Sequence, residues 1–597
     1  MFLKFIFVLG TLFLTSPLTA GLTSVSTGLS SAAQLSVHTG QTTHADQPAS
    51  AVQSARSGQS ASELPAATDP AYSHAETPKL VIGIMVDQMR YDYIYRYWDL
   101  YGEDGLRRLV NEGFSFDHAH FDYFPTFTGP GHASVYTGTT PAVHGIIGNS
   151  WYLRETGRST YVTEDPSVST VGSDSDEGEM SPRWMLSTSI SDELRLHTNM
   201  RSKSVAISLK DRGSILPAGF LGEAYWFDYG EARFITSTFY REELPGWMEE
   251  FNDRHLPAEY LSEPWETLLP IEEYTASIDD DNPYEGTFSG QERPVFPHDL
   301  PAYAEESGYG IVAGTPFGDK LLFELSKAAI EGEGLGRDPF TDLLAVSFSS
   351  PDHVGHRYGP TAVEVQDTYL RFDRELARFL DYLDDEIGLE NVLIFLTSDH
   401  GAAHNQAYLE DLKAPTGGLD RSALSDSLSE RLSEIYGFDP VASLRSTQLF
   451  LNNELIRQNG VRPEQVQRDA AAIMIETDGV AGALTADALR STDFTDTIRQ
   501  RIQRGYNPSR SGDLLYWLDP QWFTSARSVG TTHGSPWSYD ARAPLIWFGW
   551  QIPSGRTTAP VYISDIASTI ANFINTPYPS GNTGHPMNHL IFGGSGQ

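Results

Sequence analysis

Five short apolar runs, spread over most of the chain, constrain the fold more than any other feature. Each is continuous rather than alternating, which is typical of a strand that is buried on both faces of a parallel sheet. The intervening sequence holds amphipathic helices, such as the one whose apolar stripe runs from Val365 to Leu383 in steps of three and four residues. Strands that alternate with helices predict an α/β fold with a mostly parallel central sheet. The runs are 79–86, 204–209, 343–349, 392–397 and 544–549.

Acidic and histidine residues follow the first, third and fourth of these predicted strands, and one further histidine precedes the last strand. Ligands of open α/β sheets gather outside the carboxyl ends of the strands, so we expect these side chains to converge. Each has a simpler explanation on its own: a strand-terminal Asp often forms a turn, an Asp and a His four residues apart can be a surface pair, and a lone His can be a polar loop residue. Their joint occurrence at equivalent positions favours a site. The residues are Asp87, Asp352, His356, Asp399, His400 and His533.

The composition narrows the chemistry of such a site. The chain has no cysteine, so a metal ion would be bound by histidine and carboxylate side chains, which suit zinc. Several ligands of each type would hold two ions, an arrangement suited to phosphoryl transfer. The net charge of −38 argues against nucleic-acid binding, which needs clustered Lys and Arg.

Thr128 is the candidate nucleophile. It lies in the segment Phe124–Ser134, just before a predicted helix start. A threonine there is commonly an N-cap that accepts from a backbone N–H. Alternatively, it is a nucleophile held where the helix N-terminus favours an anion and activated by a metal ion. The chemistry alone does not choose between Thr126 and Thr128, although Thr128 is closer to the helix start.

The N-terminus and the long interruptions of the strand–helix pattern suggest the domain organisation. Residues 1–20 have a lysine, an apolar run and a small-residue end, which predict a signal peptide; a retained membrane anchor is the alternative. Residues 21–77 are rich in Ser, Ala and Thr, which predicts a disordered linker. The folded domain is expected over 78–597, with inserted cap regions near 226–316 and 404–528. The predicted location is the periplasm or the cell exterior, without a stable membrane span.

These motifs together resemble the alkaline phosphatase superfamily, and within it the type I phosphodiesterase/nucleotide pyrophosphatase fold. The resemblance spans roughly residues 79–575. It implies that Thr128 is the nucleophile and that it binds one zinc together with Asp87, Asp399 and His400. It also implies that Asp352, His356 and His533 bind the second zinc. The sequence Thr-Gly-Pro-Gly-His at 128–132 departs from the Thr-Phe-Pro-Asn-His of many diesterases, beside the threonine rather than at it.

Three further polar residues bear on the substrate. Lys210 and Arg212 follow the second predicted strand with one residue between them, and Asn149 follows the segment 144–147. A phosphate monoester is a dianion, whose charge such cations and an amide can bind. Alone, Lys210 and Arg212 are equally well explained as a solvated strand end. However, they resemble the phosphate-irrepressible alkaline phosphatases, in which an Asn, a Lys and an Arg contact phosphate oxygens.

The predicted function is a secreted two-zinc alkaline phosphatase that hydrolyses phosphate monoesters through a phosphothreonine intermediate and releases inorganic phosphate. Asn149, Lys210 and Arg212 would bind the phosphoryl oxygens. One alternative is a phosphodiesterase of the same fold, which would share every metal ligand. Another is a non-catalytic phosphate- or metal-binding protein. A sulfatase is disfavoured, because sulfatases of this superfamily use a formylglycine made from Cys or Ser.

Overall fold

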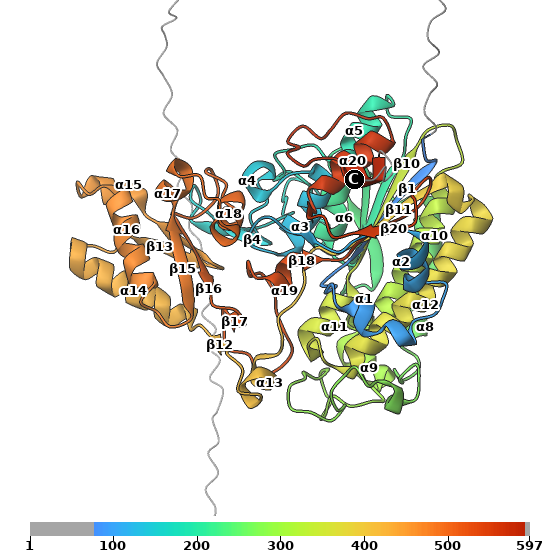
Figure 1. Ribbon diagram of the computed structural model, residues 1–597, viewed down its shortest axis with the longest axis horizontal. Coiled ribbons are helices and arrows are strands. Elements are labelled where there is room, and N and C mark those ends of the chain that lie inside the picture. The colour runs from blue at the N-terminus through green and yellow to red at the C-terminus, as the bar shows by residue number, and fades with distance from the viewer. Residues whose placement is uncertain (1–76, 592–597) are drawn as a thin grey trace, which may run out of the picture. The chain divides into compact units, whose positions relative to one another are not determined.

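A ten-stranded sheet organises the protein, and its five central strands are parallel neighbours (Figure 1). The structure is a computed structural model that describes residues 77–591. In sheet order the strands are β20 (Gly555–Thr557), β2 (Phe114–Phe116), β19 (Leu545–Gly549), β11 (Val392–Thr397), β1 (Leu80–Val86), β10 (Asp342–Phe348), β7 (Ser204–Ser208), β8 (Glu223–Asp228), β9 (Arg233–Ser237) and β6 (Thr170–Val171).

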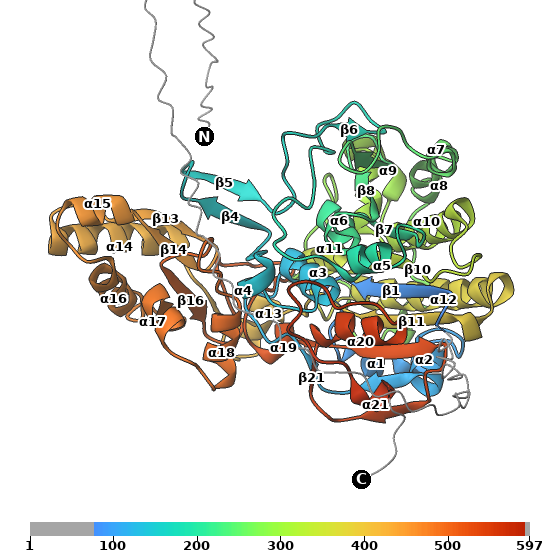
Figure 2. The same cartoon turned by 90° about the horizontal axis from the view of Figure 1, so that it is seen from above.

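Helices cover both faces of this sheet, which explains why its strands are apolar throughout. Along β1, Ile82 and Ile84 face one hydrophobic core and Val81 and Met85 face the other. The first core is completed by α1 (Tyr93–Arg96), α2 (Leu106–Glu112), α10 (Phe317–Glu333) and α12 (Val363–Glu386). The second is completed by α3 (Thr128–Thr137), α5 (Ile190–His197), α6 (Asp211–Ala218) and α20 (Asp565–Phe573), as Figure 2 helps to follow.

The predicted α/β architecture is confirmed, with one difference in strand direction. Four of the five apolar runs form β1, β7, β10 and β11, which are parallel neighbours. The fifth forms β19, which is antiparallel to β11. An apolar run records burial on both faces and carries no information about direction, so the sequence pattern does not distinguish the two cases.

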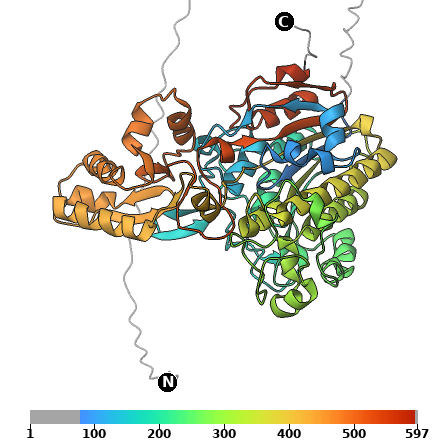
Figure 3. The same ribbon diagram turned by 60° about the horizontal axis from the view of Figure 1, so that its bottom comes forward.

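The segment after the fourth predicted strand builds a smaller sheet with a hydrophobic core of its own, coloured orange in Figures 1 and 3. Its strands, in order, are β13 (Val441–Arg445), β14 (Gln448–Leu451), β16 (Leu514–Leu518) and β15 (Val480–Thr485), packed with α14 (Arg421–Tyr436) and α16 (Pro463–Met474). In the other predicted insertion, residues near 226 belong to β8 and β9 and extend the main sheet. That both segments are insertions stays a prediction.

The remaining elements are short. The helices are α4 (Pro141–His144), α7 (Gly246–Asp253), α8 (Leu256–Tyr260), α9 (Leu300–Ser307), α11 (Ser350–Tyr358), α13 (Gln406–Asp411), α15 (Asn453–Gln458), α17 (Ala486–Ser491), α18 (Thr497–Arg504), α19 (Ser538–Ala541) and α21 (Asn588–Ile591). The strands are β3 (Ala119–His120), β4 (Ser150–Leu153), β5 (Arg158–Tyr161), β12 (Gly417–Gly418), β17 (Trp522–Phe523), β18 (Arg542–Ala543) and β21 (Val561–Tyr562).

The predicted signal peptide at 1–20 and the predicted linker at 21–77, apart from Thr77, lie outside the described residues. Between residues 77 and 591, no helix is both long and apolar enough to cross a lipid bilayer.

Candidate active site

The acidic and histidine residues that follow three parallel strands converge with His533, which comes from a loop. We call Asp87, Asp352, His356, Asp399, His400 and His533 the strand-end cluster. Asp87 directly follows β1, whereas Asp399 and His400 follow β11 after one residue. Asp352 and His356 lie one turn apart on α11, the helix that follows β10. His533 comes from the loop before α19.

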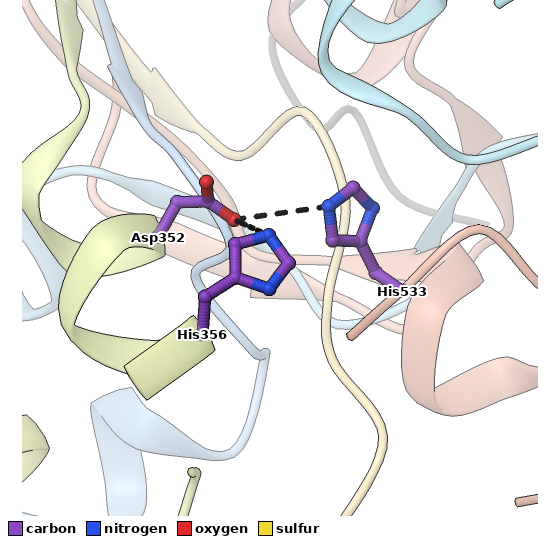
Figure 4. A group of neighbouring side chains, drawn as sticks. All are labelled: Asp352, His356 and His533. Carbon is purple, nitrogen blue, oxygen red and sulfur yellow. Dashed lines mark ion pairs between the residues drawn. The ribbon is translucent and has the colours of Figure 1, made fainter. Parts of the chain in front are cut away.

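Two groups within this cluster are close enough to hold a cation. The potential ligand atoms of Asp352, His356 and His533 all lie within 4.8 Å of one another. Both imidazoles face the Asp352 carboxylate, with Nε2 of His356 at 3.1 Å and Nε2 of His533 at 3.8 Å from Oδ1 (Figure 4). The second group also meets the 4.8 Å limit and consists of Asp87, Asp352 and His400. Asp352 therefore belongs to both groups.

Asp399 was predicted to share an ion with Asp87 and His400. Its Oδ2 lies 3.5 Å from Nε2 of His400, and Oδ1 of Asp87 lies 3.4 Å from the same nitrogen. All three side chains are fully buried, and among the described residues these three atoms have no hydrogen-bond partner. Orphaned buried carboxylate and imidazole atoms are costly unless something binds them. A divalent cation fits this arrangement.

The three histidines present the correct nitrogen for metal binding. Nδ1 of His356 donates to the Thr531 carbonyl, Nδ1 of His533 to Thr126, and Nδ1 of His400 to Gly401, at 2.9, 2.9 and 3.0 Å. Because a carbonyl only accepts, the proton resides on Nδ1 and each Nε2 is left with a lone pair. Metal-binding histidines in proteins are usually oriented in this way.

Electrostatics also suit cation binding. Burial, followed by the charge of Asp87, raises the pKa of Asp399 well above its usual value. Burial lowers the pKa of His400 to about 4, so its imidazole is neutral. Although burial opposes it, positive charge on His356, when this imidazole is protonated, and on Lys210 lowers the pKa of Asp352 well below its usual value. Positive charge brought into the cluster relieves the repulsion between these carboxylates.

Thr128 is the first residue of α3 and is almost fully buried. Phe127, not Thr128, is the N-cap residue, and in the described part of the chain no side chain caps this helix. The first turn packs against the Asp399 loop: a Cβ at Gly131 would lie 2.5 Å from the Asp399 carbonyl oxygen, so only glycine fits there. Thr126, the alternative nucleophile, donates its hydroxyl hydrogen to the Ser535 carbonyl at 2.9 Å.

The three predicted phosphate-binding residues surround this helix start and the cluster. Nζ of Lys210, at the start of α6, donates to Oδ2 of Asp87 at 2.7 Å and also pairs with Asp352. Oδ1 of Asn149 accepts from the backbone N–H of Gly129 at 2.8 Å, so the amide is held against the first turn of α3. Arg212 donates to the Tyr161 hydroxyl at 2.7 Å. Lys210 thus contacts the cluster, and Arg212 is held by a tyrosine that the sequence did not suggest.

Gln88 is a second residue that sequence analysis missed. Its side chain donates to Oδ1 of Asp352 and its backbone N–H donates to Oδ1 of Asp399, so it links two arms of the cluster. It adopts a positive φ of 63°, which is uncommon outside glycine. The sequence could have suggested Gln88 only through its position directly after Asp87 at a strand end, because a glutamine side chain does not by itself indicate a role in a metal site.

Comparison with known proteins identifies the family. The family model described as type I phosphodiesterase/nucleotide pyrophosphatase matches residues 81–537. The chain belongs to this family. The resemblance to the wider alkaline phosphatase superfamily is thereby confirmed as well.

Two relatives and two solved structures extend this result. A Myroides odoratus protein named calcium-transporting ATPase is 44% identical over 86% of this chain and 95% of its own. Alkaline phosphatase PafA of Elizabethkingia meningoseptica is 40% identical over 86% of this chain and 94% of its own. A crystal structure of PafA superposes with a TM-score of 0.83 at 40% identity, covering 86% of this chain and 99% of that one. Another solved structure is a PafA variant with a threonine, an asparagine, a lysine and an arginine replaced.

Proposed function

We propose that this protein is a phosphoric monoester hydrolase, an exported alkaline phosphatase with two zinc ions. The observation that carries this proposal is the contact between Lys210 and the two carboxylates Asp87 and Asp352, which brings a cation to a cluster suited to metal ions. A monoester brings two negative charges, so a lysine at the metal ligands favours it over a diester.

The replaced residues of the PafA variant support the same assignment. The threonine and asparagine replaced there are separated by the same number of residues as Thr128 and Asn149. The lysine and arginine replaced there are two positions apart, like Lys210 and Arg212. We therefore assign Thr128 as the nucleophile and Asn149, Lys210 and Arg212 as ligands of the phosphoryl oxygens.

The proposed reaction has two displacements. The Thr128 oxygen attacks phosphorus in line, so a Thr–O–P bond forms while the bond to the ester oxygen breaks and the alcohol leaves with a proton. Water then attacks the phosphothreonine, releases inorganic phosphate and restores the hydroxyl. Lys210, Arg212 and the amide N–H groups of Asn149 bind the oxygens on which charge is spread in the transition state.

Asp352, His356 and His533, the first ligand group, would hold one zinc. Asp87, Asp399 and His400, whose atoms without a partner among the described residues lie around Nε2 of His400, would hold the other, next to Thr128. Zinc, when bound, supplies the positive charge that lowers the pKa of a nearby hydroxyl and neutralises phosphoryl oxygens. Residues 1–20 would act as the signal peptide for export to the periplasm or the cell exterior.

The test is a pair of matched substitutions at the two candidate threonines. Thr128→Ala should lower kcat/KM for p-nitrophenyl phosphate by roughly a thousandfold or more, while zinc content measured by mass spectrometry stays at the wild-type value. Thr126→Val, which removes only a hydrogen bond to a carbonyl, should cost less than about tenfold. Near wild-type turnover in Thr128→Ala would refute the nucleophile assignment. Phosphothreonine trapped by acid quench should map to Thr128.

A further inference from the structure

A cavity of about 120 Å³ lies beside the candidate active site. Its wall includes His533 and also Phe127, the residue before Thr128. Phe124 also lines it, and three more aromatic residues come from a distant part of the chain, namely Trp522, Phe523 and Tyr539. Five aromatic side chains thus surround a space that shares His533 with the strand-end cluster. Small-molecule sites in proteins are typically concave, apolar and lined by aromatic residues in this way.

Phe127 is fixed in the wall of this cavity. Its ring packs edge-on against the imidazole of His533, with 5.6 Å between the ring centroids. Gly534 makes this contact possible: a Cβ there would lie 2.3 Å from the Phe127 ring, and φ at Gly534 is +111°. The loop that carries His533 and Gly534 therefore positions both a candidate metal ligand, His533, and the ring of Phe127 in the cavity wall.

Trp522 and Tyr539, elsewhere in the wall, are also held in place. A Cβ at Gly479 would lie 2.0 Å from the indole of Trp522, so the backbone packs directly on that ring. The Tyr539 hydroxyl accepts from the backbone N–H of Gln521 at 3.0 Å, which ties the tyrosine to the residue before Trp522. Rigid walls lower the entropic cost of ligand binding, because little ordering is left to occur.

We propose that this cavity binds a planar aromatic ring carried by the leaving group of the substrate, and this rests on the proposed monoesterase function. The phosphoryl group is the same in every monoester, so a cavity beside the reaction site can only recognise the ester group. The volume suits a single ring, since an engineered protein cavity of about 150 Å³ binds benzene. Aromatic walls strengthen such binding, because a well-placed pair of rings attracts beyond the area that it buries.

The experiment compares 2-phenylethyl phosphate with ethyl phosphate. Both are esters of primary alcohols, so the ratio of their kcat/KM values reports binding of the ring rather than the chemistry of the departing oxygen. Trp522→Ala should lower this ratio by about three- to tenfold, the range that corresponds to loss of one aromatic contact. Trp522→Phe, which keeps an aromatic ring at this position, should retain most of the wild-type ratio. Tyr309→Ala, which removes an exposed aromatic residue outside the cavity, should leave the ratio unchanged.

Thr524→Phe provides a second test that does not remove a packed side chain. Thr524 also lines the cavity, and a ring there should fill it and lower the ratio as Trp522→Ala does. An unchanged ratio in Thr524→Phe, or in a folded Trp522→Ala protein, overturns the proposal. Failure of the proposed function would look different: ethyl phosphate would either not be hydrolysed by the wild type or still be hydrolysed by Thr128→Ala.

Discussion

Two buried acidic clusters in this protein balance their charge in different ways. In the strand-end cluster, two carboxylates contact a neighbouring lysine, Lys210, and potential metal-ligand atoms lie close together. The second, which we call the Glu285 cluster, consists of Glu285, His298 and Glu364, all buried. Within residues 77–591, no lysine or arginine forms an ion pair with Glu285 or Glu364.

In the Glu285 cluster, the negative charge of the carboxyls is avoided by bound protons, and hydrogen bonds hold the side chains. Nε2 of His298 donates to Glu364 at 3.0 Å, because Nδ1 accepts from the Gln291 amide at 2.9 Å. Burial raises the pKa of Glu285 to about 8 and the pKa of Glu364 well above its usual value, so both carboxyls are neutral over much of the pH range. Buried acids therefore do not make a metal site by themselves. Among residues 77–591, Oε2 of Glu285 and Oε2 of Glu364 also lack a hydrogen-bond partner, but only residues of the strand-end cluster bring three potential ligand atoms within 4.8 Å of one another.

Removal of metal should have the largest effect on turnover. This effect should come from the strand-end cluster and not from the Glu285 cluster. Chelation with dipicolinate should abolish turnover, by at least about a hundredfold, because Thr128 then loses its activation and only Lys210 is left to offset the charges of Asp87 and Asp352. It should also lower the unfolding free energy by about 4 kcal/mol if the ion was present at a thousandfold excess over its Kd. Kinetics and thermal unfolding, before and after zinc is restored, are the measurements.

One substitution in each cluster then shows which of the two clusters binds the zinc. Asp399→Asn should lower the zinc content, whereas Glu364→Gln should leave it unchanged. Full activity in protein shown by mass spectrometry to be free of metal would contradict the metal-dependent mechanism. Loss of zinc in Glu364→Gln would mean that the comparison between the clusters is wrong.

Lys210 is the next residue to test, because it gives the strand-end cluster a cationic contact that, among residues 77–591, the Glu285 cluster lacks. Lys210→Met should lower kcat/KM for an aryl phosphate monoester by roughly 10- to 100-fold, the value of a charge-assisted hydrogen bond to a phosphoryl oxygen. The matching diester should lose less than about threefold, because it has one less charge to bind. Equal losses on both substrates would show that Lys210 only supports the carboxylates.

The strand-end cluster could be predicted because its residues are tied to strands that the sequence reveals. Asp87, Asp399 and His400 lie within three residues of a buried apolar run, and the fold brings the ends of such runs together. His533 was harder, because it belongs to a loop rather than a strand end, and the resemblance to a known family supplied its role.

Other features depend on side-chain directions that no local pattern encodes. Gln88 links Asp352 and Asp399 only because its backbone turns to a positive φ. The sharing of Asp352 between two ligand groups depends on distances between separate strands. Glu285 and Glu364 are 79 positions apart in the sequence, so their buried cluster follows from tertiary packing alone. The direction of β19 was equally invisible in its composition.

The Glu285 cluster is also expected to make the stability of the protein depend on pH. Glu285 is protonated in the folded protein up to about pH 8 but ionised in the unfolded chain above its ordinary pKa of 4.5. The folded state therefore binds more protons in this window, so the stability that Glu285 contributes is complete below pH 4.5 and is lost as the pH rises towards 8. The slope is at most about 1.4 kcal/mol per pH unit for one group.

Glu285→Gln should flatten this slope, because an amide mimics the protonated carboxyl and does not titrate. The difference in thermal unfolding temperature between the variant and the wild type should grow in favour of the variant from pH 5 to pH 8. Glu292→Gln, at an exposed glutamate nearby in the sequence, is the matched control and should show no such trend. A difference that stays constant across this range would mean that Glu285 is ionised in the folded protein, and the distinction between a cluster balanced by protons and one balanced by cations would then fail.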